Sequence, residues 1–291
     1  MCDQHFEDDL TKYLSPQALT RRQFGALSIG VGMAMLLPRA ADALDVTESV
    51  VNVKTPDGTA DCYFVHPASG AHAGVLVWPD ILGLRPAFRQ MGKRLAESGY
   101  AVLVVNPFYR QKKAPVVPVG ASFADESTRN TVLPLAQALS ATTHVTDAKA
   151  FVAFLDSQAA VNKNRKIGTT GYCMGGPIVM RTAAAVPGRI GAGASFHGGG
   201  LVTNQPDSPH LLIPTMKAQF LFAVAENDDQ REPESKNVLR QAFMKAGLPA
   251  EIEVYAGAAH GWCPPDSAVY NQAQAERAWS RLLVLFEKAL A

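Results

Sequence analysis

The sequence has almost no net charge and few cysteines. Its 27 basic and 26 acidic side chains leave a formal charge of +1 at pH 7 over 291 residues. Proteins that bind nucleic acid carry a basic excess that neutralises phosphates, so we expect no nucleic-acid partner. The four cysteines form no Cys-x-x-Cys pair and no cluster with histidine, which is not the spacing of a zinc site. We expect no metal ion, and the chemistry derived below needs no organic cofactor.

The sequence also lacks internal repeats, low-complexity tracts and interdomain linkers. Its N-terminal apolar stretch is short. This stretch, Gly25–Leu37, is too short to span a bilayer comfortably as a helix. It follows the pair Arg21 and Arg22 and precedes the small-x-small sequence Ala-Asp-Ala at 41–43. That arrangement is typical of a twin-arginine export signal. The alternative is an amphipathic N-terminal helix that contains a chance arginine pair.

The export signal predicts the compartment and the domain organisation. We expect the twin-arginine (Tat) export machinery to read residues 1–43 and deliver residues 44–291 to the periplasm as one domain. After cleavage we expect no stable association with the membrane. Cys62, Cys173 and Cys263 remain in the mature chain. An odd number of cysteines in an oxidising compartment implies at least one free thiol.

Apolar runs alternate with helical patterns from residue 74 onward, which predicts the fold class. This alternation favours right-handed βαβ units, and therefore an α/β fold with a mostly parallel central sheet and helices on both faces. A hairpin at 50–66 precedes it at the sheet edge, and residues 107–140 are expected to form a loop and a short helix. The strands are expected at 74–79, 101–106, 166–170, 189–196, 218–225 and 250–255. The helices are expected at 86–98, 142–160, 177–185, 234–246 and 267–290.

Several polar side chains follow directly after the predicted strands. Parallel sheets of this class carry their sites outside the carboxyl ends of the strands, so these side chains are expected at one edge. The residues are Asp80, Arg110, Cys173, His197, Asp228 and His260.

The sequence Gly171-Tyr-Cys-Met-Gly175 lies between a predicted strand and a predicted helix. This is the pattern of a nucleophile elbow with cysteine in place of serine. The turn strains the backbone at Cys173, and the two glycines leave room for the strand and the helix to approach. A helix N-terminus beneath the sulfur favours the thiolate. The alternative is a buried structural cysteine in a glycine-rich turn.

The nucleophile, an acid and a histidine occur in the chain order of α/β-hydrolases. His260 is expected to take the proton of Cys173 or to form an ion pair with its thiolate. Asp228 is expected to orient the imidazole, and Asp229 is the rival for that role. The oxyanion of the intermediate needs two N–H donors, which we assign to Met174 and Ile81. For His197 we favour a structural or supporting role over a catalytic one.

These motifs resemble the dienelactone hydrolase family. The resemblance rests on Gly-Tyr-Cys-Met-Gly-Gly at 171–176, Asp-Ile-Leu-Gly at 80–83 and Ala-His-Gly-Trp at 259–262, and it covers roughly residues 50–290. It implies the α/β-hydrolase fold, a Cys-Asp-His triad, and hydrolysis of esters or lactones. It also implies that Asp80, Arg110 and Trp262 bind the substrate, with Asp80 holding the resting thiol protonated.

The sequence departs from the family pattern at two of these positions. Asp80 stands where the family prototype has a glutamate, which is one methylene longer. The prototype's second carboxylate-binding arginine has no counterpart shortly after His260, where Trp262 and Cys263 occur instead. Arg85 is the candidate substitute, and the alternative for Arg85 is a solvated surface residue.

We therefore predict a periplasmic, cysteine-dependent hydrolase of small carboxylic esters or lactones that is monomeric or weakly dimeric. A thioesterase or another esterase of the same fold is the alternative enzyme. A catalytically inactive α/β-hydrolase that binds a ligand is a second alternative. A thiol redox protein, with Cys263 as the partner of Cys173, is a third.

Overall fold

The computed structural model describes Leu37 and residues 43–291. The predicted export signal at 1–43 therefore falls almost entirely outside the described residues. Within the described part of the chain, no helix combines the length and the apolar character needed to cross a membrane.

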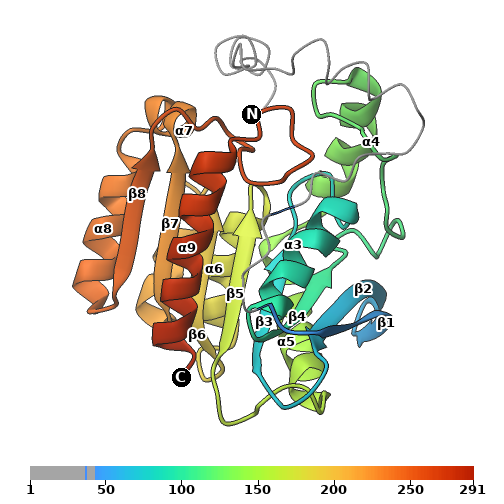
Figure 1. The fold of residues 1–291 in the computed structure, drawn as a ribbon. Helices are drawn as coiled ribbons and strands as arrows, with labels where there is room; N and C mark the ends of the chain where they lie inside the picture. The colour runs from blue at the N-terminus through green and yellow to red at the C-terminus, as the bar shows by residue number, and fades with distance from the viewer. Residues whose placement is uncertain (1–36, 38–42) are drawn as a thin grey trace.

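One eight-stranded sheet forms the centre of the molecule (Figure 1). Its spatial order is β1-β2-β4-β3-β5-β6-β7-β8. The strands are β1 (Val46–Thr55), β2 (Gly58–Pro67), β3 (Ala73–Trp78), β4 (Tyr100–Val105), β5 (Ile167–Tyr172), β6 (Ile190–Phe196), β7 (Gln219–Ala225) and β8 (Ala250–Tyr255). The β1–β2 hairpin pairs antiparallel at one edge, and β4, β3, β5, β6, β7 and β8 run parallel. The predicted mostly parallel sheet with an edge hairpin is confirmed.

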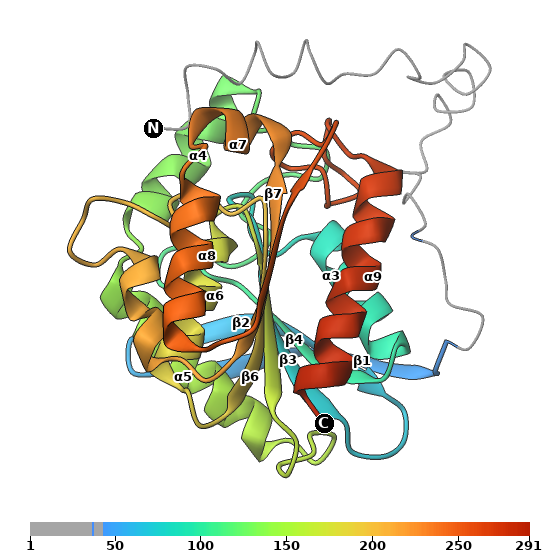
Figure 2. The same ribbon diagram turned by 90° about the vertical axis from the view of Figure 1, so that its left-hand side faces the viewer.

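Helices cover both faces of the sheet, as Figure 2 shows. The first face carries α3 (Pro86–Glu97) and α9 (Gln272–Ala289), and the opposite face carries α5 (Ala141–Ser157), α6 (Gly175–Ala185) and α8 (Ser235–Ala246). The α4 helix (Glu126–Gln137) and the short α7 helix (Glu226–Arg231) lie at the same end of the sheet (Figures 1 and 2). The sequence did not predict α7 or the 3-10 helix η1 (Pro209–Thr215).

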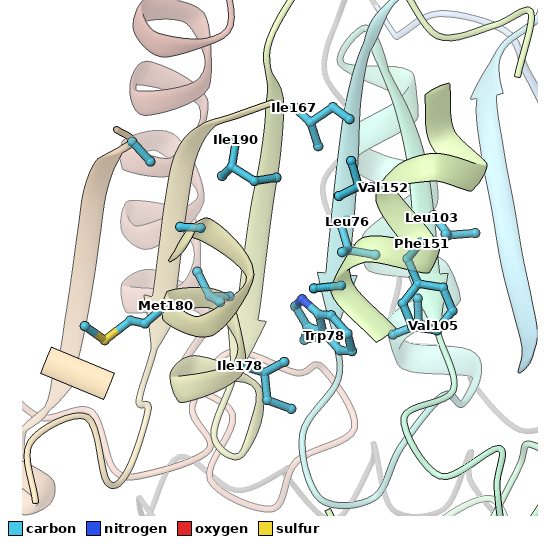
Figure 3. Packing of buried hydrophobic residues seen from close by; sticks show 14 of the residues in the cluster. Leu76, Trp78, Leu103, Val105, Phe151, Val152, Ile167, Ile178, Met180 and Ile190 are labelled. Atoms are coloured by element: carbon cyan, nitrogen blue, oxygen red, sulfur yellow. The ribbon is translucent and has the colours of Figure 1, made fainter. Parts of the chain in front are cut away.

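The core is split by the sheet into two apolar layers. Strands β3, β4, β5 and β6 are buried along their whole length, as expected for parallel strands covered on both faces. Figure 3 shows Leu76, Trp78 and Phe151 in the layer between the sheet and α5. The rings of Trp78 and Phe151 meet edge to face, with centroids 5.6 Å apart. Trp78 ends β3, so this packing fixes the point where the loop toward the site begins.

Candidate active site

Cys173 occupies the sharp turn between β5 and α6. Its φ of 51° lies in the left-handed region, which costs a non-glycine residue about 1–3 kcal/mol. The turn closes because its glycines carry no side chain. A Cβ on Gly171 would lie 2.3 Å from the carbonyl oxygen of Gly175, and one on Gly175 would lie 2.4 Å from that of Trp78. The strand, the elbow and the helix are present where the sequence predicts them.

His260 and Asp228 meet at this edge of the sheet. The Nδ1 atom of His260 lies 2.7 Å from Oδ2 of Asp228, and the side chain of Cys173 is near enough to His260 to affect its ionisation. Burial disfavours the imidazolium, but the charge and hydrogen bond of Asp228, together with the nearby sulfur of Cys173, raise the pKa of His260 well above its ordinary value. The rival acid Asp229 binds Lys236 instead, with Nζ at 2.6 Å.

Asn227 is a positioning residue that the sequence reasoning missed. Its side-chain oxygen accepts the backbone N–H of His260 at 2.8 Å, and its side chain is buried. Asn227 and Asp228 are neighbours in α7, so this short helix holds both the backbone and the ring of His260. The polar run Glu226-Asn227-Asp228-Asp229 after a predicted strand is the only signal in the sequence for this arrangement.

The two residues assigned to the oxyanion hole lie in one local cluster. Ile81 and Met174 pack against the same group of buried side chains, which includes Phe108 and Val116. The loop after β3 and the elbow are therefore adjacent. Met174 directly precedes α6, where backbone N–H groups are not used by the helix itself. This placement is compatible with two converging N–H donors.

Asp80 directs its carboxylate to Arg85 and to its own loop. Its Oδ1 atom accepts the N–H of Leu82 at 2.9 Å, and both of its oxygens bind the Arg85 guanidinium. Arg85 also binds Asp266 through Nε and Nη2. The guanidinium suggested as a substitute carboxylate ligand is thus already saturated by two carboxylates of the protein.

Arg110 is also bound by carboxylates of the protein, on the α5 side of the sheet. Its Nη1 and Nη2 atoms bind both oxygens of Asp147 at 2.8 and 2.7 Å, and Nη2 also binds Asp57 at 2.6 Å. The guanidinium stacks on the ring of Tyr109. The structure therefore shows Arg110 in internal ion pairs, and these contacts do not test its predicted contact with a substrate carboxylate.

Trp262 is part of the core and does not line an open site. Its side chain is fully buried, and its ring stacks on Tyr255 with centroids 5.3 Å apart. It also packs against His197 at 5.1 Å. Trp262 presents no exposed surface to a substrate in this conformation, and its assignment to substrate binding stays a prediction.

His197 lies beneath the elbow. It follows β6, it is buried, and its Nδ1 atom lies 3.1 Å from the backbone nitrogen of Cys173. Burial, together with the nearby charge of His260, holds its pKa well below the ordinary value of histidine. The ring is thus neutral, as its role as an acceptor requires.

The open parallel sheet and the cysteine elbow define an α/β-hydrolase. Residues 60–290 match the model of the dienelactone hydrolase family, and the chain belongs to this family. It is 27% identical over 249 residues to a carboxymethylenebutenolidase of Rhodococcus opacus, covering 83% of this chain and 92% of the relative. The chain is accordingly a hydrolase of this family.

Solved structures agree with this fold. A dienelactone hydrolase-like promiscuous phosphotriesterase from metagenomic libraries matches with a TM-score of 0.70 and 19% identity, covering 84% of this chain and 99% of that one. A dienelactone hydrolase from Anabaena variabilis matches with a TM-score of 0.58 and 20% identity over the same shares. At these identities the likeness speaks for the fold alone.

Proposed function

We propose that this hydrolase cleaves small carboxylic esters or lactones through Cys173, with His260 as the base and Asp228 as the orienting acid. The observation that carries the proposal is the chain of contacts from the strained elbow to His260 and on to Asp228, with His260 and Asp228 2.7 Å apart. The names of the relatives supply the ester and lactone class.

The reaction follows from these groups. The sulfur of Cys173 attacks the carbonyl carbon while His260 holds the thiol proton, and the N–H groups of Met174 and Ile81 stabilise the oxyanion. The carbon–oxygen bond breaks, His260 returns the proton to the leaving alkoxide, and a thioester remains on Cys173. Water then attacks the thioester and gives up a proton to His260. The carbon–sulfur bond breaks, the acid leaves, and His260 returns the proton to the sulfur of Cys173. Asp228 stabilises the imidazolium in both steps.

The thiol redox alternative has less support. Its resolving thiol would be Cys263, which is buried, and burial raises the pKa of Cys263 well above the ordinary value of a thiol. A thiol in such surroundings is a poor attacking group because the thiolate is the reactive form. Cys62, Cys173 and Cys263 are all free in the described structure.

The test is turnover of p-nitrophenyl acetate and of a panel of uncharged lactones. We expect wild-type turnover that iodoacetamide abolishes, with one alkylated cysteine in the Cys173 peptide. Cys173→Ser and Cys173→Ala should be nearly inactive, whereas Cys62→Ser should behave as wild type. Full activity in Cys173→Ala would refute the nucleophile. Ligand binding without turnover would favour the inactive-hydrolase alternative.

We also propose export to the periplasm through the twin-arginine signal. The support is the order of the arginine pair, the short apolar stretch and the small-x-small sequence in residues 21–43. Arg21→Lys combined with Arg22→Lys should hold the protein in the cytoplasm. Fractionation that finds the double variant in the periplasm at the wild-type level would refute the signal.

A further inference from the structure

His197 touches both the proposed nucleophile and the proposed base without being either. Its Nδ1 atom accepts the backbone N–H of Cys173 at 3.1 Å, an N–H that is shared with the carbonyl oxygen of Phe196 at 3.0 Å. The ring also meets the ring of His260 edge to face, with centroids 5.0 Å apart. One buried side chain therefore links the two reacting residues.

The backbone of His197 is strained, and its surroundings hold the strain. Its φ of 40° is in the left-handed region, as is that of Cys173. Its N–H donates to the carbonyl oxygen of Ala223 at 2.8 Å. The loop then presses against the start of α6, where a Cβ on Gly176 would lie 2.7 Å from the Cα of Gly198. Non-glycine residues keep such conformations where the surrounding structure fixes them, and these positions cluster at functional sites.

The protonation of the ring follows from its contacts. A neutral imidazole that accepts at Nδ1 carries its proton on Nε2. In the described structure the Nε2 atom is buried and has no hydrogen-bond partner. An unpaired buried donor costs stability, so a purely apolar side chain would suit this position better if packing alone mattered. The contact that distinguishes histidine from an apolar residue is the acceptor for Cys173.

We propose that His197 is a positioning residue that holds the Cys173 backbone and the His260 ring in register through its neutral imidazole. The inference rests on the proposed function. Without the acceptor, the elbow backbone at Cys173 loses one of the two hydrogen bonds of its N–H. The sulfur and the adjacent Met174 N–H are then less closely held relative to His260.

The matched pair His197→Asn and His197→Leu tests the acceptor. The two side chains have nearly the same size, both lose the ring contact with His260, and only asparagine retains an acceptor near the position of Nδ1. Asparagine also tolerates the left-handed φ of residue 197 better than leucine, so the thermal midpoints of the two variants are measured beside kcat. We expect kcat of the leucine variant to be roughly tenfold below that of the asparagine variant, with KM within about twofold, because a positioning bond acts on the reacting geometry. Equal kcat in the two folded variants would overturn the proposal, whatever their thermal midpoints.

The alkylation rate of Cys173 separates this inference from the proposed function. If wild-type protein hydrolyses no ester, the proposed function fails, but the iodoacetamide rates of the two variants still report on the elbow. We expect the Cys173 rate to differ severalfold between them, and equal rates would count against His197.

Imidazole nitrogen NMR of the wild type tests the tautomer even if the leucine variant does not fold. We expect a neutral Nε2–H ring for His197 that stays unchanged while His260 titrates. An Nδ1–H tautomer or a charged His197 at pH 7 would overturn the proposal.

Discussion

Arg85 holds both carboxylate oxygens of Asp80, with Nη1 2.6 Å from Oδ1 and Nη2 2.9 Å from Oδ2. The same guanidinium binds Asp266 at 2.7 and 2.9 Å. Asp80 belongs to the loop after β3, next to Ile81, and Asp266 follows His260 in the chain. Arg85 therefore connects the loop of the proposed oxyanion donor with the segment that leads on from the proposed base.

Arg85→Met should destabilise the fold strongly, because it leaves the buried carboxylate of Asp80 without its cation. We expect the free energy of unfolding in urea to fall by about 3–5 kcal/mol. Asp266→Asn is the control and should cost no more than about 1 kcal/mol, since the Asp266 side chain is 38% exposed. The double variant Asp80→Asn/Arg85→Met should recover part of the loss, and equal effects of Arg85→Met and Asp266→Asn would contradict this account.

Asp228→Asn should lower kcat by about 10³- to 10⁴-fold while leaving the protein folded. The imidazole loses the charge that stabilises its protonated form and the acceptor that fixes its orientation. Asp229→Asn is the matched control, because Asp229 binds Lys236 and not His260. Steady-state kinetics with p-nitrophenyl acetate compares the two. A large loss in Asp229→Asn with a normal Asp228→Asn would show that the wrong acid has been chosen.

Arg110→Ala should affect neutral esters and esters with a free carboxylate by the same factor. Its guanidinium is bound by Asp147 and Asp57. The Asp147 side chain is only 2% exposed, so loss of the guanidinium leaves a buried carboxylate unpaired and weakens the fold around α5. We expect a lower thermal midpoint and an unchanged ratio of kcat/KM between the two substrate types. A rise in KM confined to the carboxylate substrate would restore the role first predicted for Arg110.

The features that the sequence predicted well depend on local chemistry. The buried parallel strands are continuous apolar runs, and the elbow needs glycine at 171 and 175 whatever surrounds it. The α7 helix was missed because Glu226–Arg231 is short and polar and has no apolar period. The pairing of His260 with Asp228 could still be predicted, since both residues follow strands that end at one edge of the sheet.

The partners of the cations could not be predicted, because they come from distant parts of the chain. Arg85 meets Asp266 across 181 residues, and Arg110 meets Asp147 across 37 residues. Only the folded structure shows that these guanidinium groups are already paired. The burial of Trp262 could not be predicted for a related reason, since the sequence around a tryptophan after His260 is the same whether its ring is buried or open.

His144 gives the fold a sensitivity to acid that can be separated from the active site. The residue lies in α5, it is buried, and neither ring nitrogen has a hydrogen-bond partner in the described structure. Burial, together with the charges of Arg181 and Arg110, lowers the pKa of His144 to about 3. An unfolded chain takes up this proton near the ordinary value of about 6.5.

His144→Leu should therefore reduce the loss of stability in acid. Between about pH 6.5 and 3 the unfolded wild-type chain binds the extra proton, so the free energy of unfolding decreases as the pH falls, by up to about 1.4 kcal/mol per pH unit from this one group. Leucine removes that contribution, and near pH 8 the variant should be at least as stable as wild type because no unpaired polar atom is buried.

Urea unfolding at pH 8, 6.5, 5.5 and 4.5 measures how the free energy of unfolding of wild type and of His144→Leu depends on pH. His66→Leu, at a partly exposed position in β2, is the control for a histidine exchange as such. Parallel pH slopes for wild type and His144→Leu would show that His144 is not held neutral in the folded protein.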